Sequence, residues 1–276
     1  MKLHFANSAL VKAPKRVLLP HSRWSETVHL QVRYGILEHP RFGPVLIDTG
    51  YDRHVTNEPG RSLGLRAYNA MIRPALRKGG SLRNTLSSLG YELADVRKII
   101  VTHFHADHVS ALRCFPEAEI ITQKTTLLKI LDRCSISNLH RGIFPELLPE
   151  DITPRTTDIV KRPVQKAPLN LGDGHDVLGD GSVIAVNLPG HAEGHFGLCF
   201  PGFSPALLYG CDVQWMQAAL SKSQQLPLLG RLVLDEKRAA RGSSQMVSSF
   251  RDAGGEVVLC HDPDPTPYDL KCSEDD

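Results

Sequence analysis

The first fifty residues alternate between hydrophobic and polar positions. Every second residue from Val28 to Tyr34 is apolar, which is the period of a strand with one buried face. A proline- and glycine-bearing segment over residues 39–44 then leads to the short apolar run 45–47. The pattern predicts two paired strands joined by a turn.

Residues 51–80 carry scattered arginines and glycines instead of a regular apolar period. A helix is expected from about Leu65 to Leu76, and Pro74 should end or kink it early. A segment of this length between core strands is typical of a lid or a binding loop, but a solvated surface insertion explains the composition equally well. Leucines at helical spacing predict a further helix from Leu82 to Leu89, which Gly90 would end.

Short apolar runs continue through the rest of the chain. They predict strands at residues 99–101, 118–122, 183–186, 196–200, 206–209 and 257–260. Helices are expected over residues 125–131 and 236–250, with a short one inside the proline-rich stretch 141–152. Asp180-Gly181 predicts a two-residue hairpin turn, and the acidic end 273–276 should fray. Strands and helices thus alternate in two similar halves, which predicts a single α/β domain over residues 1–276 with helices outside two β-layers.

Composition narrows the function classes. The chain is 41% hydrophobic and 22% charged with a formal charge of +2, so it lacks the basic surplus that favours nucleic acid or an anionic membrane as a partner. Neither a signal-peptide core nor an apolar stretch near 18 residues is found, so we expect a cytoplasmic protein with no membrane span. Without C-x-x-C spacing, Cys199, Cys211 and Cys260 are expected to be buried free thiols.

Metal-capable side chains follow the apolar run 99–101. Within six residues the chain places His103, His105, Asp107 and His108. Imidazole and carboxylate groups suit a borderline cation such as zinc. A polar turn whose histidines only cap the strand is the alternative.

Three later residues each stand just beyond a short apolar strand: His191, Asp212 and His261. If the strands enter one core side by side, their ends share an edge and these side chains can converge there. Singly, each residue has an ordinary explanation as part of a turn or as a cap. Together with the histidine turn, they predict a metal centre.

Five motifs, in this order along the chain, resemble the metallo-β-lactamase superfamily of metallo-hydrolases. They are Asp48-Thr49-Gly50, T-H-F-H-A-D-H at 102–108, P-G-H at 189–191, Cys211-Asp212 after a strand, and C-H-D at 260–262. The resemblance covers residues 25–262 and implies an αββα sandwich with a dinuclear site at one edge of the two sheets.

Carried over residue by residue, the resemblance assigns seven ligands. The first metal would take His103, His105 and His191, the second would take Asp107, His108 and His261, and Asp212 would bridge both. Asp48 would support the site without touching a metal, and His195 would orient its neighbours.

The resemblance implies two metal ions, and five histidines with two carboxylates make zinc the first choice, although iron or manganese also suits these ligands. Two cations roughly 3.5–4 Å apart need a shared anionic ligand, which Asp212 would provide. A water bridging them would lose a proton near neutral pH and become the nucleophile, and Asp107 would pass the proton to the leaving group. His105 replaces the glutamate of the flavodiiron branch, which argues against oxygen reduction. The absence of G-x-S-x-G removes support for a serine hydrolase.

The run from His175 to His195 is most similar to the branch that contains N-acyl homoserine lactone hydrolases. That branch usually places a tyrosine soon after the bridging aspartate to bind the substrate carbonyl, whereas Val213 to Trp215 stand here and only an indole N–H could donate. We therefore predict a hydrolase of a small-molecule lactone or ester, with residues 51–80 and 135–165 flanking the pocket. The alternatives are a glyoxalase II-type thioester hydrolase, a phosphodiesterase, a mononuclear-iron sulfur dioxygenase, and a non-catalytic binding protein that keeps its metal. A homodimer is a candidate assembly.

Overall fold

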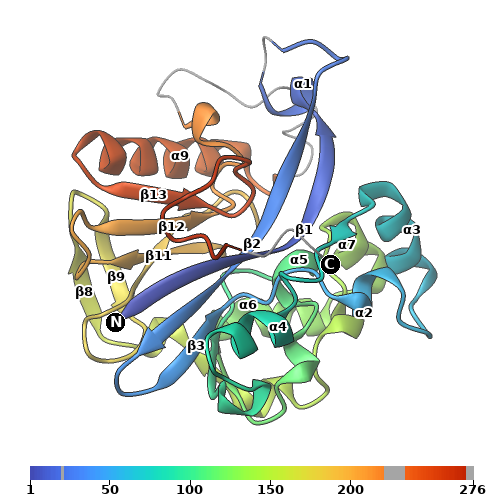
Figure 1. Cartoon of the computed structure of the whole chain (residues 1–276), viewed down its shortest axis with the longest axis horizontal. Helices are drawn as coiled ribbons and strands as arrows, with labels where there is room; N and C mark the ends of the chain where they lie inside the picture. The colour runs from blue at the N-terminus through green and yellow to red at the C-terminus, as the bar shows by residue number, and fades with distance from the viewer. Residues whose placement is uncertain (20–21, 221–233, 272–276) are drawn as a thin grey trace. The chain divides into compact units, whose positions relative to one another are not determined.

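The computed structural model describes residues 1–19, 22–220 and 234–271 (Figure 1). The chain divides into two compact units that interleave along the sequence. The first unit holds Met1–Lys12, Gln31–Thr157 and Pro265–Asp276, and the second holds Ala13–Leu30 and Asp158–Asp264. The expectation of a single domain stays a prediction. The acidic end that was expected to fray lies outside the described residues.

A seven-stranded mixed sheet has the strand order β4-β1-β2-β3-β5-β6-β7. Its strands are β1 (Lys2–Pro14), β2 (Thr27–His39), β3 (Gly43–Ile47), β4 (Ala75–Leu76), β5 (Lys98–Ile100), β6 (Glu119–Thr122) and β7 (Thr156–Asp158). β2 and β3 form the hairpin that the alternating pattern predicted. β3, β5 and β6 run parallel, so their carboxyl ends lie at one edge of the sheet. Asp48 and His103 follow the ends of β3 and β5 at that edge.

Several short helices belong to the first unit. They are α2 (Arg53–Thr56), α3 (Leu63–Ile72), α4 (Leu82–Ser88), α5 (Ala106–Val109), α6 (Lys124–Asp132), α7 (Ser135–His140) and α8 (Ile152–Arg155), with 3₁₀ turns η1 (Leu93–Asp95), η2 (Leu112–Cys114) and η3 (Pro145–Leu147). α4 and α6 confirm the predicted helices. α3 ends before Pro74, and the two residues after that proline pair with β1 as β4. The short helix expected within 141–152 is the 3₁₀ turn η3.

A six-stranded sheet lies in the second unit, with the order β13-β12-β11-β10-β9-β8. Its strands are β8 (Val164–Ala167), β9 (Gly172–Asp176), β10 (Ile184–Asn187), β11 (Phe196–Phe200), β12 (Leu207–Cys211) and β13 (Glu256–Leu259). The remaining helical segments are α1 (Lys15–Leu18), η4 (Ile159–Lys161), η5 (Gln217–Ala219) and α9 (Lys237–Asp252). α9 packs along this sheet through its buried Val247 and Phe250 (Figure 1). β12 and β13 are parallel, which brings their carboxyl ends together.

Two expectations for the second half of the chain were wrong. Residues 177–183 separate β9 from β10, so the turn at Asp180-Gly181 is not a two-residue hairpin. The Asp176 carboxylate accepts hydrogen bonds from the backbone N–H groups of Gly179 and Gly181, each at 2.9 Å, and so organises a longer loop. Strands and helices also do not alternate over residues 164–211, all of which are described, because β8 to β12 are antiparallel neighbours that need no crossover helix.

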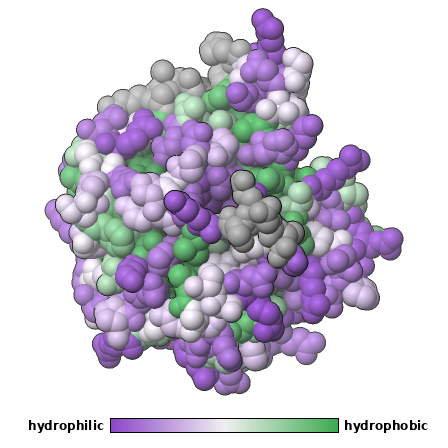
Figure 2. Space-filling view, viewed as in Figure 1, coloured by the Kyte–Doolittle hydropathy of each residue, from purple (hydrophilic) through white to green (hydrophobic). Residues whose placement is uncertain are grey.

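The buried cysteines were predicted correctly. Cys199, Cys211 and Cys260 are each 0% exposed, and none of them forms a disulfide. Cys272 lies outside the described residues. Among the described helices, none combines the length and the apolar character that crossing a membrane requires. Figure 2 shows hydrophilic and hydrophobic residues intermixed over the face that it draws.

Candidate metal centre

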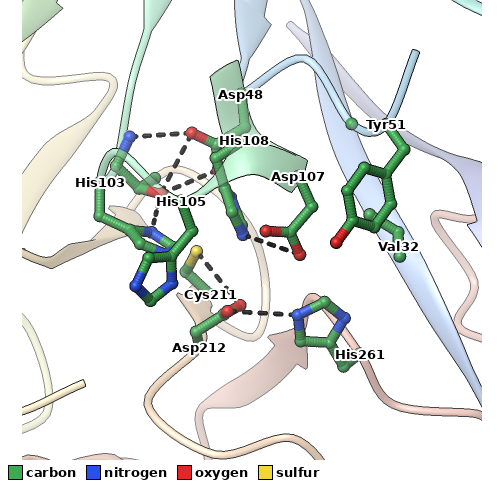
Figure 3. Close-up of polar contacts among 12 residues, drawn as sticks. Val32, Asp48, Tyr51, His103, His105, Asp107, His108, Cys211, Asp212 and His261 are labelled. Carbon is green, nitrogen blue, oxygen red and sulfur yellow. Dashed lines mark hydrogen bonds and ion pairs between the residues drawn. The ribbon is translucent and has the colours of Figure 1, made fainter. Parts of the chain in front are cut away.

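Asp48 links two of the strand ends in the first unit. Its carboxylate is 0% exposed and accepts hydrogen bonds from the backbone N–H of Thr102 at 2.8 Å and from the Thr102 hydroxyl at 2.9 Å (Figure 3). Asp48 also contacts His108, whose Nδ1 lies 2.9 Å from Asp48 Oδ2. This bond fixes the imidazole so that its Nε2 lies 3.6 Å from the carboxylate of Asp107. A carboxylate behind a histidine is the usual way in which proteins orient a metal-binding imidazole.

The imidazoles of His103, His105 and His108 lie close together beside Asp48. His103 Nε2 lies 3.1 Å from His105 Nδ1, and the ring centroids of His103 and His108 are 4.0 Å apart. His105 directly precedes α5, whose single turn carries Asp107 and His108. The structure therefore brings together all four predicted ligands of the first unit. Facing ring nitrogens at this distance can share a proton or a cation.

Local hydrogen bonds hold the Asp48-Thr49-Gly50 loop against α5. The backbone N–H and hydroxyl of Thr49 both donate to the carbonyl of His108, at 2.9 and 3.0 Å. Gly50 has a φ of 66°, and a Cβ there would lie 2.4 Å from the hydroxyl of Ser8. The position therefore requires glycine, because a side chain would meet both backbone strain and a buried neighbour.

The second unit gathers the other three predicted ligands around one carboxylate oxygen. Asp212 Oδ2 lies 3.2 Å from His191 Nε2 and also 3.2 Å from His261 Nε2; Figure 3 draws the latter contact. All three side chains are buried, with 5%, 3% and 8% of each residue exposed for His191, Asp212 and His261. The thiol of Cys260 lies within 4.8 Å of the candidate ligand atoms of Asp212 and His261. Cys260, expected from the sequence only as a buried free thiol, is a softer donor directly before His261.

α9 fixes the turn that presents His191. Gly190 has a φ of 118°, and a Cβ on it would lie 2.0 Å from the backbone nitrogen of Ala240. The Ser243 hydroxyl donates to the carbonyl of Pro189 at 2.7 Å. The P-G-H motif is thus a close contact between a turn and a helix, which only glycine permits.

His195 holds the backbone around Asp212. Its Nδ1 lies 2.7 Å from the carbonyl oxygen of Leu188, and its Nε2 accepts a hydrogen bond from the backbone N–H of Asp212 at 3.3 Å. Both ring nitrogens therefore have protein partners, and the geometry fits the orienting role expected of this residue.

A pair of tyrosines beside Asp107 was missed from the sequence. The hydroxyls of Tyr51 and Tyr68 lie 2.6 Å apart. Burial raises the pKa of Tyr51 well above its usual value, and the nearby Tyr68 and the charge of Asp107 raise it further. The only signal in the sequence was that Tyr51 directly follows the Asp48-Thr49-Gly50 motif.

The two clusters fit metal ions by the chemistry of their donors. Buried imidazole nitrogens and carboxylate oxygens occur together in each unit, and such groups suit zinc, iron or manganese.

Comparison with known proteins then decides the family. A family model described as the metallo-beta-lactamase superfamily matches residues 31–202, which is more than half of the chain. The chain belongs to the metallo-β-lactamase superfamily. It is a hydrolase of this superfamily, and its relatives include N-acyl homoserine lactonases.

Two relatives illustrate the range. N-acyl homoserine lactonase AttM of Agrobacterium fabrum is 26% identical over 273 residues, covering 96% of this chain and 94% of the relative. A probable metallo-hydrolase of Mycobacterium tuberculosis is 27% identical over 237 residues, covering 80% and 72%.

Solved structures confirm the fold class. An N-acyl homoserine lactone hydrolase with the product N-hexanoyl-L-homoserine bound at its catalytic metal centre aligns with a TM-score of 0.68 and 20% identity, covering 95% of this chain and 93% of that one. A probable metal-dependent hydrolase from Staphylococcus aureus aligns with a TM-score of 0.69 and 13% identity, covering 95% and 89%. The expected metallo-β-lactamase fold, an αββα sandwich, is confirmed.

Proposed function

We propose that this superfamily member is a dinuclear metal-dependent hydrolase that cleaves a small lactone or ester. The observation that carries the proposal is the arrangement around Asp212, where one carboxylate oxygen meets the Nε2 atoms of His191 and His261 at 3.2 Å each. An oxygen placed against two imidazoles suits a ligand shared between cations. The lactonase relatives supply the substrate class.

The proposed ligand set combines the clusters of both units. We assign one zinc to His103, His105 and His191, the other to Asp107, His108 and His261, and Asp212 to both. When bound, the cations would lower the pKa of a water so that it is available as hydroxide near neutral pH, and would polarise the target carbonyl. The same ligands also suit iron and manganese.

The chain's own residues have separate tasks in this proposal. Asp48 holds His108 through Nδ1 at 2.9 Å, so that Nε2 points to the ligand cluster. Asp107, only 7% exposed, would accept a proton and return it to the leaving oxygen. His195 would keep the backbone of Asp212 in place through the 3.3 Å bond from its N–H.

Elemental analysis of the purified protein, run alongside a substrate panel, tests the proposal. We expect about two metal ions per chain and turnover of N-acyl homoserine lactones, with thioesters and phosphodiesters as the competing substrates of the panel. His103→Ala and Asp212→Ala should abolish turnover while the chain stays folded by circular dichroism.

His175→Ala is the matched control, because this histidine of β9 contacts a backbone carbonyl at 3.1 Å and lies outside the proposed ligand set. It should leave both metal content and activity unchanged. Full activity in metal-depleted Asp212→Ala protein would refute the mechanism, and turnover of only thioesters or phosphodiesters would refute the substrate class. The cytoplasmic location and the homodimer stay predictions.

A further inference from the structure

Tyr51 and Tyr68 form a hydroxyl pair near Asp107, a proposed metal ligand. Tyr51 lies just after the Asp48-Thr49-Gly50 loop, and Tyr68 projects from α3. Tyr51 is 5% exposed and Asp107 is 7% exposed, so both residues are almost completely buried. Figure 3 shows the phenol oxygen of Tyr51 pointing toward the carboxylate of Asp107.

The pair carries more protons than its internal hydrogen bond uses. Two phenols hold two protons, and at 2.6 Å one of these lies between the oxygens. The second proton can serve an acceptor outside the pair. A phenol has an ordinary pKa of about 10, so the Tyr51 hydroxyl is protonated at neutral pH and can donate.

Segments far apart in the sequence contact each other beside the tyrosine pair. The ring of Tyr68 lies 5.0 Å from the ring of Phe144, and the adjacent Ile143 forms an isolated bridge with His105. The backbone N–H of Ser62 donates to the carboxylate of Glu146 at 2.9 Å. Parts of the segments 51–80 and 135–165 therefore contact each other and extend to a proposed metal ligand, as a substrate-binding wall would.

We propose that Tyr51 donates a hydrogen bond to the substrate carbonyl oxygen that becomes negative during attack, and that Tyr68 is a positioning residue acting through Tyr51. The inference rests on the proposed function. The 2.6 Å contact allows either hydroxyl to donate; in this proposal Tyr68 donates to the Tyr51 oxygen, which leaves the Tyr51 proton for the substrate beside Asp107. A donor placed where charge develops stabilises the transition state more than the bound substrate.

Single and double phenylalanine variants test this with zinc-loaded protein and N-hexanoyl homoserine lactone. Tyr51→Phe should lower kcat about 30-fold and change KM less than about threefold. Tyr68→Phe should lower kcat about fivefold in the wild-type background and hardly at all in the Tyr51→Phe background. A purely structural role of Tyr68 would cause a loss in both backgrounds. Tyr91→Phe, which removes a hydroxyl that donates to Glu38 at 3.1 Å, is the control and should change neither constant.

Calorimetry with the product N-hexanoyl homoserine adds a readout that needs no turnover, since a carboxylate oxygen of the product can occupy the place of the carbonyl. Its affinity should fall about tenfold in Tyr51→Phe and stay unchanged in Tyr91→Phe. If the wild type hydrolyses the lactone, and Tyr51→Phe equals Tyr91→Phe in kcat and in product affinity, this inference alone is overturned. A zinc-loaded wild type that neither hydrolyses the lactone nor binds the product would overturn the proposed function and this inference together.

Discussion

Replacing Asp48 by asparagine should weaken metal binding without unfolding the chain. Asp48 has a φ of 58°, a left-handed conformation that asparagine and aspartate both tolerate, so the substitution adds no backbone strain. The carboxylate accepts from the backbone N–H of Thr102 at 2.8 Å and contacts His108 Nδ1 at 2.9 Å through its other oxygen. An asparagine amide has only one acceptor oxygen, so it can satisfy one of these partners and must turn an NH₂ group to the other.

The expected magnitude follows from the role of the lost acceptor. Removing the carboxylate behind a metal-binding histidine typically lowers metal affinity about 10- to 100-fold, which corresponds to about 1.4–2.7 kcal/mol. Losing one buried hydrogen bond to a charged group should also lower the metal-free free energy of unfolding by about 1.5–3 kcal/mol. Asp48→Ala removes every one of these bonds and should lose more than Asp48→Asn in both quantities.

Competition against a chromophoric zinc chelator measures the affinity, and urea denaturation of metal-free protein measures the stability. Asp176→Asn is the matched control, because that carboxylate is 2% exposed and accepts from Gly179 and Gly181 but belongs to neither ligand cluster. It should lose stability and keep its zinc affinity. If Asp48→Asn holds zinc as tightly as the wild type, Asp48 does not orient a ligand and the argument for this contact is wrong.

Three further predictions concern stability, and urea denaturation checks each. Arg33 is fully buried against Asp269, at 2.8 Å, so Asp269→Ala should cost about 3 kcal/mol or more, whereas the double replacement of both residues by apolar ones should cost much less than the sum of the single replacements. The hydrogen bond from His4 lowers the pKa of Glu38. The Glu38 carboxylate therefore stabilises the fold above its unfolded pKa of about 4.3, and this contribution is lost as the pH falls through the lower folded pKa. Glu38→Gln should be less stable than the wild type by under about 1 kcal/mol at pH 7 and equally stable in acid. Gly190→Ala should cost at least about 2 kcal/mol, since its Cβ would lie 2.0 Å from the backbone of α9.

The candidate ligands were predictable because they follow strands whose apolar pattern is clear. Ile99 and Ile100 are fully buried in β5, and His103 stands three positions after Ile100. The same holds for Asp212 after β12 and His261 after β13. Where a buried strand ends is visible in a single sequence, and a parallel pairing brings such ends to one edge.

Features that depend on tertiary contact could not be predicted in this way. β8 and β9 were missed because their sequences, V-Q-K-A and G-D-G-H-D, carry little apolar periodicity. The loop after β9 depends on the Asp176 carboxylate, which no turn dipeptide reveals. Tyr51 and Tyr68 are 17 positions apart on a loop and a helix, and only the packing of α3 brings their hydroxyls together.

The unusual backbone at two strand ends suggests what determines metal affinity in this chain. Asp48 and Cys211 both have positive φ, at 58° and 51°. Aspartate adopts this conformation more readily than most residues, whereas for Cys211 it costs on the order of 1–2 kcal/mol. Asp48 bonds to Thr102 and His108, and Asp212, next to Cys211, contacts two imidazoles, so positive φ and side-chain bonds occur together at both places. Side chains that are ordered before a metal binds need little further ordering when it does. Affinity should therefore depend on donor type and orientation more than on folding of the site, which is why a change of one oxygen at Asp48 is expected to be measurable in zinc binding.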